Sequence, residues 1–268
     1  MFCWWSLLLA WSCLVVSAPL ERRDADFESV RTRLRKTLSG KAGDPQEKYF
    51  HESIFHPHYD GRFAEKTLSY AEKMESLPVM VQAYLATMRD LGLETWLVHG
   101  SLLGWWWNRK TLPWDTDVDV QVAESTMHFL AEYYNMTTYR YQSPQFPQGR
   151  FYMIEVNPNY AVREGGDPLN TIDARWVDMD TGLFIDITAV RRNFTRPEPD
   201  VFSCKDGHDY RENQIFPLRD STFEGKPVKV PYAYTELLKT EYGSRALTLT
   251  SFEHHLWNET TQIWEPQE

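Results

Sequence analysis

The sequence predicts an α+β fold, in which helices flank a mixed β-sheet. Apolar residues recur with helical spacing over residues 64–91, and short runs of β-branched and apolar residues follow later in the chain. The two kinds of segment alternate, but without the regular strand–helix–strand order of a doubly wound sheet. The elements therefore belong to a mixed α+β domain rather than to a parallel α/β domain.

Periodicity and end signals predict the helices. The first spans about 64–91, with Pro78 as a point at which it can split, Ser76 as the cap of its second half, and Gly92 as its end. In the helix expected at 124–134, Met127, Leu130 and Ala131 should face the preceding strand. Two further helices are expected at 102–108 and 234–242, the last one ended by Gly243.

Short apolar runs between turn residues predict the strands. The segment Asp180-Thr181-Gly182 has the composition of a turn, and it joins two such runs into a β-hairpin. The segments 109–116 and 157–173, which contain Pro, Gly or Asn, are expected to be loops. The predicted strands are 95–98, 118–122, 151–156, the hairpin 174–178 and 183–190, and 226–231.

The N-terminus has the pattern of a secretory signal. Residues 2–18 are an uninterrupted apolar-to-small run, FCWWSLLLAWSCLVVSA, which is short for a membrane span and is followed by two arginines. We expect cleavage near Ser17 or Ala18, a charged propeptide or flexible stalk at 19–45, and one domain at 46–268. The mature chain would then have no stable membrane span, and would lie in the lumen of the secretory pathway (Golgi) or be secreted.

Cysteines and glycosylation signals fit this location. Cys3 and Cys13 lie in the leader, so the mature chain keeps only Cys204 and has no intramolecular disulfide. Three Asn-x-Thr triplets are expected to carry N-glycans on surface loops, at Asn135, Asn193 and Asn258.

Charge limits the partners. The net charge of −10 argues against nucleic acid, which needs a basic surface, and suits a protein that gathers divalent cations. Trp occurs 11 times, and its rings either stack on sugars or pack in the core; for Trp105, Trp106 and Trp107 both interpretations stay open. His51, His56 and His58 have irregular spacing and no accompanying Cys, which favours an ordinary structural role over a metal site.

Three aspartates stand out because they lie in or next to apolar strands. Asp117 and Asp119 are two residues apart, so in a strand their carboxylates point to one face and repel each other. Asp186 interrupts an otherwise apolar strand, where an unpaired carboxylate is costly. If the two strands are neighbours, a divalent cation can satisfy all three groups, and oxygen ligands suit Mg²⁺ or Mn²⁺. Asp115 could be a further ligand, a group that orients a ligand, or simply part of the loop.

A strand-to-helix turn precedes the acidic pair. Gly100 and Ser101 would expose backbone N–H groups and a hydroxyl at a helix N-terminus, a geometry that binds phosphate oxygens. Arg109 and Lys110 would add positive charge near the phosphates. Each feature alone is weak evidence for a phosphate site, because an ordinary turn or a solvated loop explains it as well. The order along the chain, a turn and helix followed by the acidic pair and then Asp186, is more specific evidence.

Two segments carry a resemblance to a known family. Residues 98–105 (VHGSLLGW) and 112–120 (LPWDTDVDV) resemble the LicD/fukutin-related signature, an HG-small-LLG turn followed by PWD-x-D-hydrophobic-D. Residues 172–178 (IDARWVD) and 182–188 (GLFIDIT) look like the fungal branch, which includes proteins implicated in mannosylphosphorylation of cell-wall glycans. Matches at 59–63 and 223–231 extend the similarity over about 49–243. Thr116 stands where many relatives have Asp.

The resemblance implies a nucleotidyltransferase-like core and a metal-dependent phosphotransferase. Asp117, Asp119 and Asp186 would be the catalytic metal ligands, with His99, Gly100 and Ser101 at the donor phosphates. The enzyme would transfer a phospho-sugar or phospho-alcohol from a nucleotide-activated donor to a glycan hydroxyl, with mannosylphosphate favoured. Two alternatives stay open: a glycosyltransferase that holds a nucleotide sugar with Asp-x-Asp, and a non-catalytic regulator or glycan-binding partner of a separate transferase.

Overall fold

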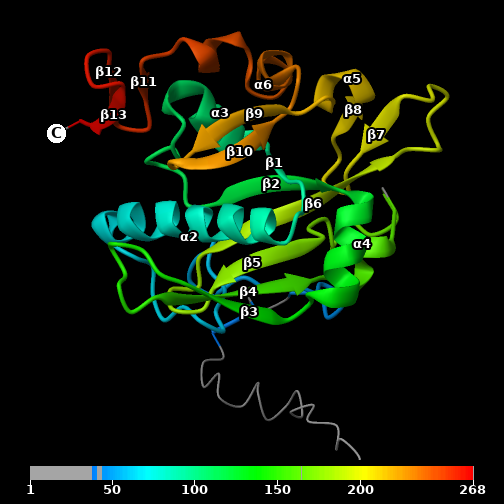
Figure 1. Cartoon of the computed structure of the whole chain (residues 1–268), viewed down its shortest axis with the longest axis horizontal. Helices are drawn as coiled ribbons and strands as arrows, with labels where there is room; N and C mark the ends of the chain where they lie inside the picture. Colours follow the sequence, from blue (N-terminus) through cyan, green and yellow to red (C-terminus); the bar gives the residue numbers. More distant parts are fainter. Residues whose placement is uncertain (1–37, 41–43, 164, 268) are drawn as a thin grey trace, which may run out of the picture. The chain divides into compact units, whose positions relative to one another are not determined.

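The computed structural model describes residues 38–40, 44–163 and 165–267, so the predicted leader and most of the predicted stalk lie outside it. Its main feature is a mixed sheet in the strand order β3–β4–β5–β6–β2–β1–β10–β9, with β7 paired to β6 and β8 (Figure 1). The pairs β2–β6 and β1–β10 are parallel and the other pairs are antiparallel. This sheet, flanked by helices, confirms the predicted α+β fold.

The strands of this sheet include the predicted ones and several short strands that periodicity does not reveal. A separate three-stranded sheet, β11–β12–β13, lies near the C-terminus. The strands are β1 (Trp96–Leu97), β2 (Val118–Ala123), β3 (Thr137–Tyr141), β4 (Arg150–Val156), β5 (Ala174–Asp178), β6 (Phe184–Arg192), β7 (Val201–Ser203), β8 (Asp209–Arg211), β9 (Arg219–Phe223), β10 (Lys226–Val230), β11 (Ser251–Phe252), β12 (His255–Asn258) and β13 (Ile263–Pro266).

The first helix differs from its predicted form at two points. It begins at Tyr70, because Ser69 and Glu72 form a reciprocal capping box there, and it continues through Pro78 without a break. Ser76 is buried inside it and caps nothing. The helices are α2 (Tyr70–Asp90), α3 (His99–Asn108), α4 (Glu124–Tyr133), α5 (Glu212–Ile215) and α6 (Tyr234–Tyr242), with 3₁₀ turns at Pro158–Ala161 and Ser244–Leu247.

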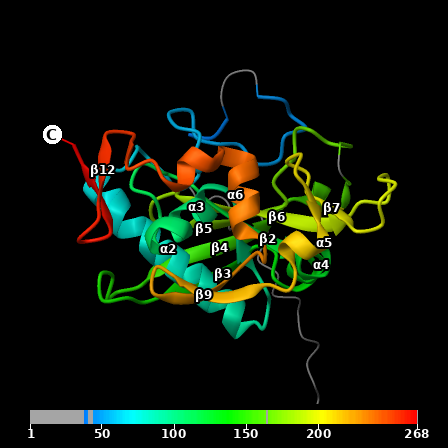
Figure 2. The ribbon, with the colours of Figure 1, turned by 90° about the horizontal axis from the view of Figure 1, so that it is seen from above.

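Helices α2 and α4 cover one face of the sheet (Figures 1 and 2). Met127 and Leu130 of α4 are fully buried and Ala131 packs against the same cluster, which confirms the predicted orientation of this helix. Trp176 of β5 lies in this core, stacked on Tyr152 and in edge contact with Tyr84. Trp176 is thus a buried core residue held by aromatic packing.

The tryptophans of α3 also have packing partners. Trp105 donates a hydrogen bond to Ser221 and contacts Tyr234, while Trp107 packs against Trp264 of β13. These contacts account for Trp105 and Trp107 as links between α3 and the C-terminal elements.

The other face of the sheet carries the polar side chains. Val118 and Val120 of β2 are buried in the helix-covered core, so the alternation of the strand turns Asp119 to the opposite side. The segment after residue 44 crosses that side (Figure 2), where Glu52 binds Arg175 of β5 and His58 approaches Asp117. Hence the candidate site lies between the sheet and this segment.

Candidate functional site

Two of the predicted aspartates are direct neighbours across the sheet. β2 and β6 pair in parallel, and Asp119 is the register partner of Asp186. Side chains opposite one another in a ladder share a face, and the strands are about 4.8 Å apart. The condition set for a shared site, that the strands of Asp119 and Asp186 are neighbours, is met.

Asp117 lies one residue before β2 and has a histidine as its neighbour. The Nδ1 atom of His58 is 3.2 Å from Oδ2 of Asp117. This carboxylate raises the pKa of His58, and although burial pushes the pKa of Asp117 upward, His58 brings it below its usual value. The sequence interpretation, which gave the histidines a structural role, missed this contact, because 59 positions separate the two residues in the chain.

Asp115 completes the acidic cluster. A Cβ placed on Gly100 would lie 3.0 Å from Oδ2 of Asp115, so the absence of a side chain at Gly100 makes room for this carboxylate. Burial and the charge of Asp117 raise the pKa of Asp115 to about 7, and the nearby Lys73 opposes this effect. Lys73 also donates hydrogen bonds to the backbone oxygens of Pro113 and Asp115, which fixes the loop before β2.

The charge balance of the cluster is unfavourable without a counterion. Burial, followed by the charges of Asp117 and Asp186, raises the pKa of Asp119 well above its usual value. The pKa of Asp186 is also raised by burial, even though Nε of Arg175 donates to its Oδ1 at 2.7 Å. Clustered carboxylates that resist ionisation are a donor set that a divalent cation would stabilise.

The fit of this cluster to a metal rests on donor chemistry and on one orphaned atom. The oxygen donors suit Mg²⁺ or Mn²⁺, and the buried Nδ1 of His58 forms no hydrogen bond although it lies beside Asp117. In the described part of the chain, however, the groups whose donor atoms all lie within 4.8 Å of one another form around His99 and His208, and not around the three aspartates. Metal ligation by Asp117, Asp119 and Asp186 stays a prediction.

The turn that the sequence predicts to bind phosphate is joined to the acidic cluster by a hydrogen bond. α3 begins at His99, so Gly100 and Ser101 occupy its first turn, where backbone N–H groups have no partner within the helix. Oγ of Ser101 accepts a hydrogen bond from the backbone N–H of Asp119 at 2.9 Å. Any group held at the start of α3 would therefore lie next to the start of β2.

Arg109 and Lys110 lie elsewhere. They follow the C-terminal end of α3, and a helix of ten residues is about 15 Å long. Both line an open hollow together with Met74, Pro78 and Gln82. The structure does not bring them to the acidic cluster, because α3 starts at His99 and carries the chain away from Gly100.

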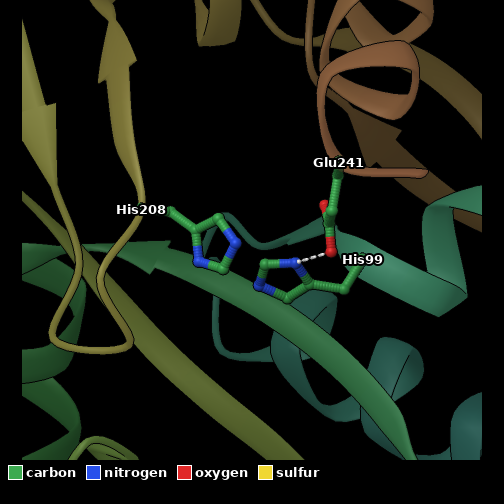
Figure 3. Close-up of side chains that lie close together, drawn as sticks. All are labelled: His99, His208 and Glu241. Carbon is green, nitrogen blue, oxygen red and sulfur yellow. Dashed lines mark hydrogen bonds and ion pairs between the residues drawn. The ribbon is translucent and has the colours of Figure 1, made fainter. Parts of the chain in front are cut away.

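His99 makes contacts on both sides of its ring. Its Nδ1 lies 2.8 Å from Oε1 of Glu241 and its Nε2 lies 3.2 Å from Oδ2 of Asp206 (Figure 3 draws the first contact). Burial lowers the pKa of His99, but these two carboxylates outweigh burial and raise it to about 10. Sequence spacing gives no signal for these partners.

The three glycosylation signals are in different surroundings. Asn135 is exposed, and Asn258 is partly exposed in β12. Asn193 is buried, and its amide nitrogen, the atom that a glycan would occupy, donates to Ser203 at 2.8 Å. The amide nitrogen of Asn258 also donates, to Glu265 at 2.9 Å, so it is their exposure that makes Asn135 and Asn258 more accessible than Asn193.

Among the helices of the described residues, none combines the length and the apolar character needed to cross a membrane. The predicted signal peptide lies outside those residues.

The resemblance in the sequence implied a nucleotidyltransferase-like core, and the structure has a mixed sheet with a helix N-terminus beside carboxylates on adjacent strands. Residues 92–233 match the model of the family described as "LicD/FKTN/FKRP, nucleotidyltransferase domain". The chain belongs to this family, and the matched region contains the start of α3, the acidic loop, β2 and β6.

Two curated relatives from Saccharomyces cerevisiae (strain ATCC 204508 / S288c) are similar to part of the chain. "Mannosyltransferase regulator 4" is 33% identical over 155 residues, which are 54% of this chain and 13% of that protein. "Mannosyltransferase regulator 14" is 31% identical over 169 residues, which are 59% of this chain and 18% of that protein. The similarity thus covers less than a fifth of either relative, and these names fit glycan modification or a regulatory role in it.

Proposed function

We propose that the chain is a metal-dependent phosphotransferase of the secretory-pathway lumen. It would move a phospho-sugar or phospho-alcohol, mannosylphosphate above all, from a nucleotide-activated donor to a glycan hydroxyl. The observation that carries this proposal is the hydrogen bond between Ser101 and Asp119, together with the register of Asp119 and Asp186. These contacts support the proposal because they bring the start of α3, which we propose binds phosphate, next to the carboxylates of Asp119 and Asp186.

Each part of the site has a role in the proposed reaction. The N–H groups of Gly100 and Ser101 would bind phosphate oxygens of the donor. Mg²⁺ or Mn²⁺ held by Asp117, Asp119 and Asp186 would neutralise negative charge on the donor phosphates. A carboxylate of the cluster would accept the proton of the attacking glycan hydroxyl.

Space for a substrate lies beside Arg175, on the side away from the helices. A hollow of about 400 Å³ has walls of both polar and apolar residues, and Arg175, which binds Asp186, forms part of them. Hydroxyl-rich groups suit such a lining, since its amide, carboxylate and cationic groups both donate and accept hydrogen bonds. The wall includes Lys48, Glu52, Asn157, Asn170 and Arg175.

A donor screen tests the proposal. Purified protein is incubated with nucleotide-activated sugars and Mn²⁺, and released nucleoside monophosphate is measured. Asp119→Asn should abolish release, whereas Asp90→Asn, the same change at an exposed site at the end of α2, should not alter it. Release that survives Asp119→Asn in full would contradict the assignment of the site.

A second function has a specific observation in its favour. Both relatives are named regulators of a mannosyltransferase, which supports a non-catalytic regulator or glycan-binding partner of a separate transferase. That function predicts no nucleotide release from any donor by the folded protein alone. It predicts stimulated release when the separate transferase is added, as nucleoside diphosphate for sugar transfer or nucleoside monophosphate for sugar-phosphate transfer.

A further inference from the structure

A second group of metal-type ligands lies beside the acidic cluster. His99 is the first residue of α3, His208 lies in the connection between β7 and β8, and Glu241 is near the end of α6 (Figure 3). One donor atom from each of the three side chains lies within 4.8 Å of the other two. Three elements that are distant in sequence therefore direct two imidazoles and a carboxylate to one point.

A fourth group joins the two histidines. Oδ2 of Asp206 is 3.2 Å from Nε2 of His99, and its Oδ1 is 3.1 Å from Nδ1 of His208. Histidines that bind a metal commonly have a carboxylate on the other ring nitrogen, which fixes the tautomer and the orientation of the ring. Asp206 has the position of such an orienting group for His99.

The details of the cluster fit a metal better than a network of ion pairs. Nδ1 of His208 faces Oδ1 of Asp206 at 3.1 Å, which leaves Nε2 as the ring nitrogen of His208 that is available to an ion. The two imidazole rings are only 4.6 Å apart, so two protonated histidines would repel each other. A cation bound by two neutral imidazoles removes this repulsion.

The distances agree with this interpretation. In a tetrahedral zinc site the bonds to nitrogen and oxygen are about 2.0–2.1 Å, which puts any two ligands about 3.4 Å apart. His99 Nδ1 and Glu241 Oε1 are 2.8 Å apart, so modest side-chain movements would allow both to ligate one ion.

We propose that His99, His208 and Glu241 bind a zinc-class transition-metal ion, with Asp206 as the carboxylate that orients the imidazoles. Nitrogen donors select such metals, whereas the aspartate cluster offers only oxygen, which suits Mg²⁺ or Mn²⁺. The centre goes beyond the proposed phosphotransfer. It would join α3, the β7–β8 hairpin and α6, and it would leave a coordination position open for water or a ligand oxygen.

The open position has a defined neighbourhood. His99 precedes Gly100 and Ser101, the residues proposed to bind phosphate, and Ser101 accepts a hydrogen bond from the backbone N–H of Asp119. An anionic oxygen bound at the start of α3 would therefore lie close to both the aspartate cluster and the His99–His208–Glu241 centre. A transition metal here is therefore placed to act on the same substrate, and its binding can be measured without any activity assay.

The test is metal binding by the purified, glycosylated chain without a polyhistidine tag. After metal removal, Co²⁺ is added and the visible absorption of four-coordinate cobalt is recorded, and zinc content is measured separately by mass spectrometry. The wild-type chain should bind one zinc ion and develop the cobalt bands. Absence of both in the folded wild-type protein overturns the proposal.

Variants locate the ion. His208→Gln and Glu241→Gln should remove the cobalt bands and weaken zinc binding by more than the roughly 100-fold that loss of an orienting group can cost. His128→Gln, at an exposed histidine of α4, is the matched control and should bind as the wild type does. Circular dichroism establishes that each variant is folded.

Two further variants separate this centre from its neighbours. Asp119→Asn should leave zinc binding unchanged, because Asp119 belongs to the aspartate cluster. Cys204→Ser should also retain zinc binding. Cys204, Asp206 and His208 form a second, overlapping group of potential ligands. Loss of zinc in Cys204→Ser would assign the ion to that group and refute the proposed ligand set.

Discussion

Ser101→Ala tests the link between the start of α3 and the acidic strand. The backbone C=O and N–H of Asp119 both point toward β1. The C=O accepts a hydrogen bond from the N–H of Val98, but β1 ends at Leu97, so no strand residue remains to accept from the N–H of Asp119. The buried hydroxyl of Ser101 takes that place. Alanine would leave the N–H of Asp119 without its acceptor.

The cost of this change follows from the contact. A buried polar group without its partner costs about 1–3 kcal/mol. Alanine recovers up to about 0.5 kcal/mol, because it favours a helix more than serine does. We expect the free energy of unfolding to fall by about 1–2 kcal/mol, which for a domain of this size lowers Tm by roughly 2–8 °C.

Thermal unfolding followed by circular dichroism measures the effect. Ser125→Ala is the matched control, because Ser125 is exposed in the first turn of α4 and its replacement should leave Tm unchanged or slightly raised. If Ser101→Ala melts no lower than Ser125→Ala, the hydroxyl of Ser101 does not hold the start of β2, and the coupling between the two parts of the site is refuted.

Three more predictions concern the cluster, the core and the surface. We expect Mn²⁺ to raise the Tm of the parent and to have no such effect on Asp119→Asn. Without metal, this variant should melt near or above the parent because one repelling charge is gone, and a clearly lower Tm would contradict this. Trp176 is 1% exposed, so Trp176→Ala should lower the free energy of unfolding by about 3–5 kcal/mol and Tm by roughly 6–20 °C in thermal unfolding. A Tm decrease of under 2 °C would show that neighbouring side chains fill the space left by the indole. Replacing Asn135 or Asn258 by Gln should each increase gel mobility by one glycan, whereas the change at buried Asn193 should have no such effect.

Local patterns predicted much of the fold. The β5–β6 hairpin follows from two apolar runs around a turn in which Gly182 has φ 76°, a conformation that glycine adopts without strain. The direction of α4 follows from the spacing of Met127 and Leu130. The limits of α2 were less accurate, because the capping box at Ser69 decides its start and tertiary packing tolerates Pro78.

Site residues could be predicted where they lie within a strand, and could not be predicted where segments that are distant in sequence come together. Asp119 and Asp186 could be predicted as neighbours, because each is a charge in an apolar strand. His58, Asp206 and Glu241 could not, since their roles depend on loops and helix ends that periodicity does not place. Arg175 gave no separate signal either, although its bond to Asp186 shapes one wall of the site.

The composition of the reaction product tests the central claim most directly. The purified chain is incubated with a mannose-containing nucleotide donor, Mn²⁺ and an acceptor glycan, and the glycan is analysed by mass spectrometry. We predict that the glycan gains one sugar together with one phosphate, and that Asp119→Asn prevents this gain. A gain of sugar without phosphate, or an unmodified glycan in the presence of folded, metal-loaded protein, would contradict phosphotransfer by this chain.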